Sequence, residues 1–280
     1  MPELPEVETI KTDLQKVVIK KKIVSVEILR SGIIKKPLEK VFKQQVNGVK
    51  IKAIVRKGKG LIFFLDNGLE LISHLRMTGG WIFCYAKDQK KKNGGSKIEK
   101  TTRVRFIFED NSELLYTDIR CFGEMSLVKD HTKEDFFMRL GPEPFDLTGV
   151  TFYKMLQKHK TSVKSLLLDQ HFIAGLGNIY VQEALFRAGI HPLVKAEALT
   201  FQQAALLLKE SKKILRLGIK NRGSTIDSYR DAAGKSGSMS KYHLVYGKEG
   251  EKCSVCGNFI KKFTIAGRGT CFCPVCQPTQ

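Results

Sequence analysis

The sequence predicts an α+β fold in which an antiparallel β domain is followed by helices and a small cysteine-rich unit. Between about residues 23 and 128, runs of β-branched and aromatic residues alternate with turn signals, as in successive strands. After Gly141-Pro142-Glu143-Pro144 the apolar spacing becomes helical. The chain then ends in two C-x-x-C pairs. We therefore expect a boundary near residues 131–150.

The individual elements follow from the spacing of apolar residues. A first helix is expected over residues 5–19, where Val7, Ile10, Leu14 and Val17 share one face. The clearest strands are expected over residues 23–29, 61–65, 69–75, 80–85, 104–108 and 114–118. The later helices are expected over residues 134–140, 151–158, 162–170, 179–188 and 200–217. Low apolar content predicts a mobile basic loop at 87–100 and a flexible surface loop at 221–240.

The charge balance indicates a polyanionic partner. The chain carries 48 Lys and Arg against 28 Asp and Glu, a formal net charge of +20, which favours nucleic acid or an acidic membrane surface. No apolar run is long enough to cross a membrane, and the N-terminus MPELPEVETI is acidic where a secretory signal is basic. We therefore expect a soluble protein that is not exported.

The seven cysteines are interpreted as metal ligands and free thiols in a reducing compartment. Two thiolate pairs on tight turns can close a tetrahedral zinc site, and the four expected ligands are Cys253, Cys256, Cys273 and Cys276. Cys84, Cys121 and Cys271 are then expected to be free thiols. The segment is too small for an apolar core, so we expect metal binding to supply much of its folding free energy.

Two further segments have the chemistry of phosphate binding. Between the cysteine pairs, Arg268 stands between two glycines, which let the backbone approach a phosphate while the guanidinium binds it. A solvated arginine is the alternative. The glycine-rich run 174–180 opens a helix whose N–H groups could bind phosphate, and Asn178 could cap that helix or contact the same phosphate. By itself, this run also fits a plain joint between helices.

The extreme N-terminus offers a nucleophile. Once Met1 is removed, Pro2 presents a secondary amine that can add to an aldehydic sugar carbon and give an iminium. The positive end of the following helix disfavours the protonated amine. Glu3 and Glu6 are candidate acid/base partners. The alternative is that these acids only complement the helix N-terminus.

Seven ordered blocks together resemble the formamidopyrimidine-DNA glycosylase family over essentially the whole chain. They lie at residues 2–9, 56–59, 73–77, 117–123, 140–144 and 175–180 and in the terminal ribbon with 266–270. The resemblance implies an N-terminal antiparallel β-sandwich with capping helices over 1–130, a linker over 131–150, a helical helix–two-turn–helix domain with a lesion-recognition loop over 151–240, and a zinc finger over 241–280. It also implies DNA binding between the two domains.

The same resemblance implies a bifunctional DNA glycosylase/AP lyase of base excision repair that removes oxidised purines such as 8-oxoguanine and formamidopyrimidines. Pro2 matches the Schiff-base nucleophile at C1′, and Glu3 the acid that assists sugar opening. Lys59 matches the lysine that is associated with β-elimination and with phosphate contact. Arg268 matches the zinc-finger arginine that is associated with δ-elimination, and Asn178 matches a residue that contacts the same DNA backbone. The family extrudes its target base.

The implied DNA contacts include three void-filling residues and further backbone contacts. The first group is Met77, Arg120 and Phe122, and the second is His74, Lys164, Asn178 and Tyr246. From the pattern alone, Met77 and Phe122 would be placed in the β-domain core. The resemblance also implies one structural Zn²⁺, a monomer, duplex DNA with oxidised purines or abasic sites as partner, and a cytoplasmic location with the nucleoid.

Three positions depart from the family pattern. Thr101 lies where a histidine is usual, Asp227 where an arginine follows the Ser/Thr run, and Gly60 where an aromatic residue is typical. All three concern recognition rather than the lyase chemistry. The alternatives are an endonuclease VIII-like relative that prefers oxidised pyrimidines, a catalytically silent DNA-binding relative, and a generic zinc-ribbon protein. A silent binder needs the cations but not the nucleophile and its acid, so the presence together of Pro2, Glu3, Lys59 and Arg268 argues against that alternative.

Overall fold

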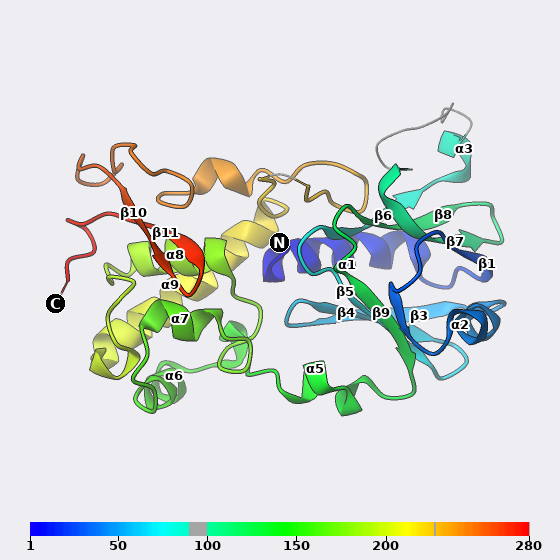
Figure 1. Ribbon diagram of the computed structural model, residues 1–280, viewed down its shortest axis with the longest axis horizontal. Helices are drawn as coiled ribbons and strands as arrows, with labels where there is room; N and C mark the ends of the chain where they lie inside the picture. The colour runs from blue at the N-terminus through cyan, green and yellow to red at the C-terminus, as the bar shows by residue number, and fades with distance from the viewer. Residues whose placement is uncertain (90–99, 227, 280) are drawn as a thin grey trace. The chain divides into compact units, whose positions relative to one another are not determined.

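The computed structural model describes residues 1–89, 100–226 and 228–279 and divides into two compact units (Figure 1). The N-terminal unit comprises Met1–Met138 and Asn221–Ser238, and the C-terminal unit comprises Arg139–Lys220 and Met239–Gln280. The segment Asn221–Ser238, which the sequence analysis groups with the helical domain, thus packs with the β domain. The zinc-finger residues pack with the helices.

The N-terminal unit is a β-sandwich with helices at its edges, as predicted. One sheet has the strand order β1-β7-β8-β6 and the other β2-β9-β5-β4-β3, with antiparallel neighbours except for the parallel pair β2 and β9. The strands are β1 Ile23–Ile28, β2 Ile34–Lys36, β3 Ile51–Lys57, β4 Gly60–Leu65, β5 Glu70–His74, β6 Gly79–Cys84, β7 Thr102–Phe108, β8 Glu113–Asp118 and β9 Glu124–Val128. The helices are α1 Leu4–Val18, α2 Glu39–Val46, α3 Ala86–Gln89 and α5 Asp135–Met138, with a 3-10 turn at His131–Lys133.

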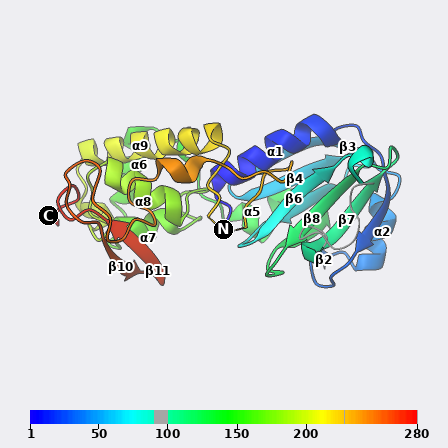
Figure 2. The ribbon, with the colours of Figure 1, turned by 90° about the horizontal axis from the view of Figure 1, so that it is seen from above.

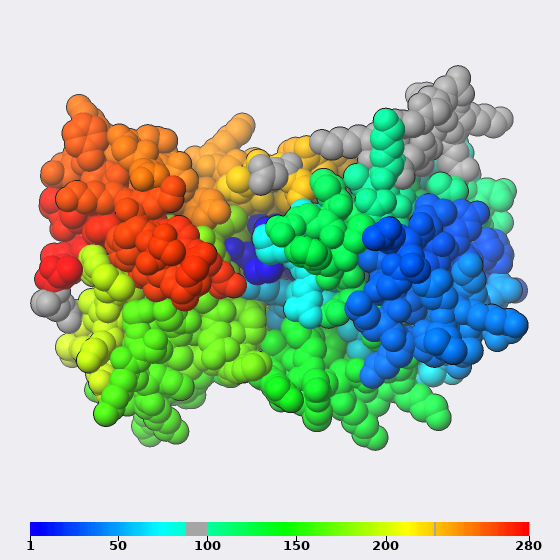
Figure 3. Space-filling model, in the orientation of Figure 1, coloured from blue at the N-terminus to red at the C-terminus, as the bar shows by residue number. Residues whose placement is uncertain are grey.

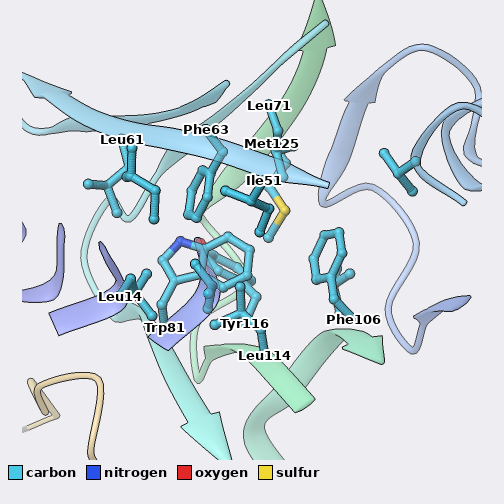
Figure 4. Packing of buried hydrophobic residues seen from close by; sticks show 14 of the residues in the cluster. Leu14, Ile51, Leu61, Phe63, Leu71, Trp81, Phe106, Leu114, Tyr116 and Met125 are labelled. Carbon is cyan, nitrogen blue, oxygen red and sulfur yellow. The ribbon is translucent and has the colours of Figure 1, made fainter. Parts of the chain in front are cut away.

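Aromatic side chains from both sheets meet in the core of the sandwich (Figure 4). Trp81 of β6 is fully buried, and its ring lies 5.3 Å from that of Phe63 in the opposite sheet and 5.7 Å from Phe106. Its indole N–H donates to the Ser73 hydroxyl at 3.1 Å, so its polar atom is also satisfied. The alternation of inward apolar residues along each strand therefore builds one core between the two sheets.

The C-terminal unit is helical and carries a two-stranded hairpin. Its elements are η2 Pro144–Asp146, α6 Gly149–Leu156, α7 Val163–Leu168, α8 Asn178–Arg187, η3 Ala196–Ala198, α9 Phe201–Lys220, η4 Met239–Tyr242, β10 Lys261–Ile265 and β11 Arg268–Phe272. Helix α8 is the centre of this unit, because it contacts α7, α9 and β11. Consequently α9 and the hairpin lie on opposite sides of α8 (Figure 2).

The sequence did not predict several elements, among them helix α2, and the loop that it predicted at residues 221–240 is packed onto the β domain. Helix α2 interrupts the β pattern with only Phe42 and Val46 buried, too few apolar residues to show a helical period. Residues 221–240 do not form a free surface loop, because Asp231 and Tyr229 are buried and Phe83 donates its backbone N–H to the Ala232 carbonyl. Because hydrogen bonds and buried polar groups hold this segment, its sequence shows no apolar pattern that would predict the packing. Most of the expected basic loop, residues 90–99, lies outside the described residues.

No helix among the described residues is both long and apolar enough to span a membrane.

The core predicts a large effect of truncating Trp81. Trp81→Ala should lower the free energy of unfolding by about 3–5 kcal/mol, because it removes the ring that fills the space between the sheets. Urea unfolding followed by circular dichroism measures this loss. The matched control is Leu29→Ala at an exposed position, which should change stability by no more than about 0.5 kcal/mol. Equal effects of the two variants would contradict the assigned core.

Candidate functional site

The N-terminus of α1 is closed by two buried glutamates. Glu3 is the N-cap residue and Glu6 the third helical residue, and they form a reciprocal capping box in which the Glu3 N–H donates to Glu6 Oε2 at 2.8 Å. Both side chains are almost fully buried, and Pro2 immediately before them is also buried. The capping box therefore fixes the position of Pro2 relative to the helix axis.

Glu6 also holds the segment Asn221–Ser238. Its Oε1 atom accepts the Ser224 N–H at 2.7 Å. A β-carbon on Gly223, whose φ is +79°, would lie 2.8 Å from Glu6 Cγ, so only glycine fits beside this carboxylate. Since both Glu6 oxygens accept backbone N–H groups, its geometry is that of a positioning residue rather than the acid/base partner considered from the sequence.

Lys59 lies at the turn between β3 and β4 and is buried. Arg56, three residues earlier, donates through Nε to Glu8 of α1 at 2.8 Å and through Nη1 to the Gly58 carbonyl at 2.9 Å. These bonds tie the turn that carries Lys59 to the first helix. The helix that begins after Pro2 and the turn at Lys59 are therefore held by one polar network, which the motif 56–59 does not reveal by itself.

His74 lies directly opposite Gly60 in the register of β4 and β5. Burial, followed by the charges of Arg76 and Lys59, lowers the pKa of His74 to about 3, so its ring is neutral near pH 7. Its Nδ1 atom accepts the Arg76 N–H at 3.0 Å. The buried neutral ring therefore positions the turn that leads to Met77.

Aromatic residues of α5 lie beside Gly60, the position where an aromatic side chain is typical of the family. A β-carbon on Gly60 would lie 3.1 Å from the rings of both Phe136 and Phe137 of α5. The Phe136 ring also packs edge-on against His74 at 4.8 Å. Aromatic rings from α5 thus fill the space beside Gly60, and they would have to shift by a few tenths of an ångström to admit a β-carbon at that position.

Asp118 holds the loop that carries Arg120 and Phe122. The buried Asp118 carboxylate accepts the N–H groups of Arg120 at 3.1 Å and Gly123 at 2.7 Å, and the hydroxyl of Thr78. The side chains of Met77, Arg120 and Phe122 are exposed, and the Arg120 guanidinium stacks 4.5 Å from the Phe122 ring. Met77 and Phe122 are therefore not core residues. Asp118 was not singled out from the sequence, although a carboxylate after a strand is a common anchor for such a loop.

A cavity of about 210 Å³ lies beside this loop in the N-terminal unit. Its lining includes Thr78, which directly follows Met77, and Ile119, which directly precedes Arg120. Arg230 of the segment Asn221–Ser238 also lines it. Thr101, one of the three departures from the family pattern, also lines it. Asp227 lies outside the described residues. The cavity has room for a purine-sized group.

The hairpin β10–β11 lies at the surface of the C-terminal unit, where it is coloured red in Figure 3. Arg268 is exposed directly after its turn, where Ala266 and Gly267 have positive φ. The hairpin is fastened to α8 because Asn178 and Gln182 both donate to the Gly269 carbonyl, at 3.2 and 3.1 Å, and Gln182 accepts the Cys271 N–H at 2.6 Å. Asn178 is the first residue of α8, and Gly177 is its N-cap. The cap interpretation of Asn178 is therefore wrong.

Lys164 of α7 lies behind Arg268. Its side chain is fully buried, and Nζ donates to the Thr270 hydroxyl at 2.5 Å. Burial, followed by the charge of Arg268, lowers the pKa of Lys164 to about 8. The structure therefore places Lys164 beneath the hairpin that carries Arg268 instead of on its outer surface.

Glu183 of α8 organises the segment that contains Tyr246. Its buried carboxylate accepts the N–H groups of Leu244, Val245 and Tyr246 at 2.9–3.0 Å. The Tyr246 side chain is half-buried and packs against the His243 ring. Glu183 was missed from the sequence, because an acidic residue inside a helix is normally solvated.

The four cysteines form a zinc site. Their sulfur atoms all lie within 4.8 Å of one another, with 3.8 Å between Cys253 and Cys276 and 3.4 Å between Cys256 and Cys273. A tetrahedron with Zn–S bonds of about 2.3 Å places its sulfurs about 3.8 Å apart, so the set fits one structural Zn²⁺. The finger also has a small apolar cluster, which it shares with Phe186 of α8. Because Cys253 and Cys273 belong to this cluster, the zinc ligands and the apolar contacts with α8 are parts of one packed unit.

Three family models cover the chain in order. The Formamidopyrimidine-DNA glycosylase N-terminal domain matches residues 1–125, the Formamidopyrimidine-DNA glycosylase H2TH domain matches 140–230, and the zinc finger found in FPG and IleRS matches 250–279. The chain belongs to the formamidopyrimidine-DNA glycosylase family. It is accordingly a zinc-containing DNA glycosylase of base excision repair.

Named relatives agree over the full length. The chain is 40% identical to a formamidopyrimidine-DNA glycosylase of Bacillus cereus and 43% identical to one of Streptococcus pneumoniae, covering 99% of both chains in each case. Among solved structures, it is similar to a Lactococcus lactis FPG mutant bound to Fapy-dG containing DNA, with a TM-score of 0.89 and 38% identity over 99% of this chain and 100% of that one. It is equally similar to a Lactococcus lactis Fpg complex with an abasic site containing DNA, with a TM-score of 0.88.

The zinc site predicts a selective effect of one cysteine. Cys256→Ser should abolish stoichiometric zinc binding while most helical and β content remains, because the two units have cores outside the finger. Metal analysis of the purified variant and circular dichroism measure the two effects. Cys271→Ala is the matched control, since Cys271 lies in β11 of the same finger but outside the sulfur cluster. A full zinc content in Cys256→Ser would refute the four-cysteine assignment.

His74 predicts an acid-sensitive stability. Because its pKa is lowered in the folded state, the unfolded chain binds the extra proton, and stability falls as the pH drops below about 6.5. Between pH 7 and pH 5 this residue should account for a loss of about 2 kcal/mol. His74→Asn keeps a hydrogen-bond acceptor but cannot titrate, so urea unfolding should show a smaller loss for the variant. An identical pH dependence in both proteins would contradict the buried neutral histidine.

Proposed function

We propose that this enzyme is a bifunctional glycosylase and AP lyase that excises oxidised purines from duplex DNA, with the Pro2 amine as its nucleophile. The observation that carries this proposal is the arrangement at the start of α1, where Pro2 directly precedes the buried pair Glu3 and Glu6. Capping by Glu6 rigidly orients the residues that would meet the sugar. Such preorganisation favours attack at one carbon atom.

In the proposed reaction, the Pro2 nitrogen forms a bond to C1′ of the damaged nucleotide as the bond from C1′ to the base breaks. The proton that the Pro2 amine loses balances the one that the departing base gains, so the base leaves as a neutral molecule. Glu3 donates a proton to the sugar oxygen as the ring opens, which leaves an iminium between Pro2 and C1′. The iminium accepts the electron pair released when the C2′ proton departs, and the 3′ phosphate leaves by β-elimination. A second elimination releases the 5′ phosphate.

The cations supply the phosphate contacts in this proposal. Lys59 and Arg268 are assigned to the sugar–phosphate backbone at the lesion, with Lys59 supporting β-elimination and Arg268 supporting δ-elimination. Exposure of Arg268 at a turn with two positive φ angles supports a close approach to phosphate. Asn178 and Lys164 hold the hairpin from behind, so we assign Lys164 to positioning Arg268. Tyr246 is assigned to a backbone contact.

Recognition is assigned to the loop that Asp118 holds. Exposed Met77 and Phe122 are suited to fill the space left by an extruded base, and Arg120 to pair with the orphaned base. The adjacent cavity of about 210 Å³ is our candidate pocket for the extruded purine. His74 acts from beneath this region by fixing the turn before Met77. We propose that the enzyme works as a monomer.

The decisive test uses the N-terminal amine. While Met1 is attached, the Pro2 nitrogen is an amide whose lone pair is delocalised, so it cannot add to a sugar carbon. A protein that begins at Pro2 should be trapped by borohydride on a duplex with 8-oxoguanine opposite cytosine. A form with an uncleaved N-terminal extension should lose trapping by at least about a hundredfold.

Equilibrium affinity for the same duplex is the matched control, and it should stay within about threefold, because the hairpin and Arg268 are unaltered. Undiminished trapping by the extended form, with the extension confirmed by mass spectrometry, would move the nucleophile to a lysine, with Lys59 the first candidate. Stronger trapping on thymine glycol than on 8-oxoguanine would instead favour the pyrimidine-specific alternative.

A further inference from the structure

A separate groove lies on the C-terminal unit, between the end of α8 and the last turns of α9. It encloses about 220 Å³. We call it the α9 groove, and its lining residues are Arg187, Lys213, Ile214, Arg216, Leu217 and Lys220. Four of these six are cations, two are aliphatic and none is acidic. The groove therefore combines a basic rim with an apolar floor.

The rim cations are only partly neutralised by neighbouring acids. Lys213 lies 3.9 Å from Glu210, and Arg187 lies 3.7 Å from Glu183, whose carboxylate already accepts three backbone N–H groups. The long, strongly exposed Lys213 side chain makes its pair weak in water. A positive field therefore remains over the groove in a protein of net charge +20.

The α9 groove is distinct from the surface assigned to lesion DNA. Arg268 and its hairpin contact one side of α8, whereas α9 contacts another, and Figure 2 shows the two on opposite sides of the C-terminal unit. None of the groove residues takes part in the bonds that fasten the hairpin, which come from Lys164, Asn178 and Gln182. The groove is thus not explained by the glycosylase reaction.

Helix stability explains only part of this surface. Lys220 in the last turn of α9 complements the negative end of the helix dipole, and Arg216 stacks over the Phe145 ring at 5.3 Å. Neither effect requires Lys213, and neither requires the partly exposed Leu217, which lies beside the buried Ile214 in the floor of the groove. The combination of rim and floor points to an occupant with both acidic and apolar groups.

We propose that the α9 groove binds a short acidic peptide segment of a partner protein, with one bulky apolar side chain anchored against Leu217 at the apolar floor. Burial of this apolar anchor and contact of the carboxylates with the basic rim both favour binding. Duplex DNA fits less well, because its outer surface offers phosphates to the rim but no apolar group that could fill the floor. Recognition therefore needs both features in one ligand.

A labelled synthetic peptide tests this proposal on the full-length zinc-loaded protein. The probe has a run of aspartates followed by a phenylalanine, and fluorescence anisotropy measures its affinity. We expect binding in the range of about 10 μM that weakens as salt rises. Replacing the phenylalanine by alanine, or the aspartates by asparagines, should each weaken binding about tenfold.

Variants of the groove provide the matched comparison. The double variant Lys213→Glu, Lys220→Glu should weaken peptide binding by at least about tenfold, and Leu217→Ser should do so without any change of charge. Lys158→Glu inverts an exposed lysine of the same unit that is not a groove residue, and should leave peptide affinity within about twofold. Circular dichroism and affinity for lesion DNA should be unchanged in all of them.

Three results would overturn the proposal. The first is peptide affinity that is equal in the double variant and in Lys158→Glu. The second is equal affinity for the peptide with and without its phenylalanine, which would leave only a non-specific charge effect. The third is displacement of the peptide by lesion-free duplex DNA, if the double variant no longer binds that DNA at the groove. This result would make the groove a second DNA site.

Discussion

The buried carboxylate of Glu6 is the interaction on which the N-terminal site depends. Desolvating a charge is costly, and here the cost is offset by two backbone donors and by the positive end of α1. One oxygen fixes Glu3 beside Pro2, and the other holds Ser224, more than two hundred residues later in the chain. A single side chain thus couples the proposed nucleophile to the segment Asn221–Ser238.

The same device recurs at the other functional segments. The Asp118 carboxylate accepts backbone N–H groups of the loop that carries Arg120 and Phe122. The Glu183 carboxylate accepts those of residues 244–246. In each case a buried carboxylate satisfies backbone groups that would otherwise be unpaired in an irregular loop. The buried acids thus provide rigidity behind the residues that we propose as DNA contacts.

The two DNA-directed groups of residues rest on different supports. Those of the N-terminal unit are positioned by the sandwich core and by buried acids, whereas Arg268 is positioned by Lys164, Asn178 and Gln182 beneath a zinc-stapled hairpin. Lys164 illustrates the consequence. A lysine with a lowered pKa is easily taken for a phosphate ligand, yet its burial against Thr270 makes it a support for Arg268.

The sequence by itself determined the fold class and the zinc ligands, because periodicity and C-x-x-C spacing are local signals that survive without tertiary context. The reactive positions that it names, Pro2 first among them, stay a prediction. Only the tertiary structure decided what depends on distant partners. It placed Met77 and Phe122 outside the core, packed the segment 221–238 onto the β domain through buried residues such as Tyr229 and Asp231, and filled the space beside Gly60 with aromatic rings from α5. The physical reason is that burial and hydrogen-bond satisfaction are set by residues far apart in the chain, which no local pattern records.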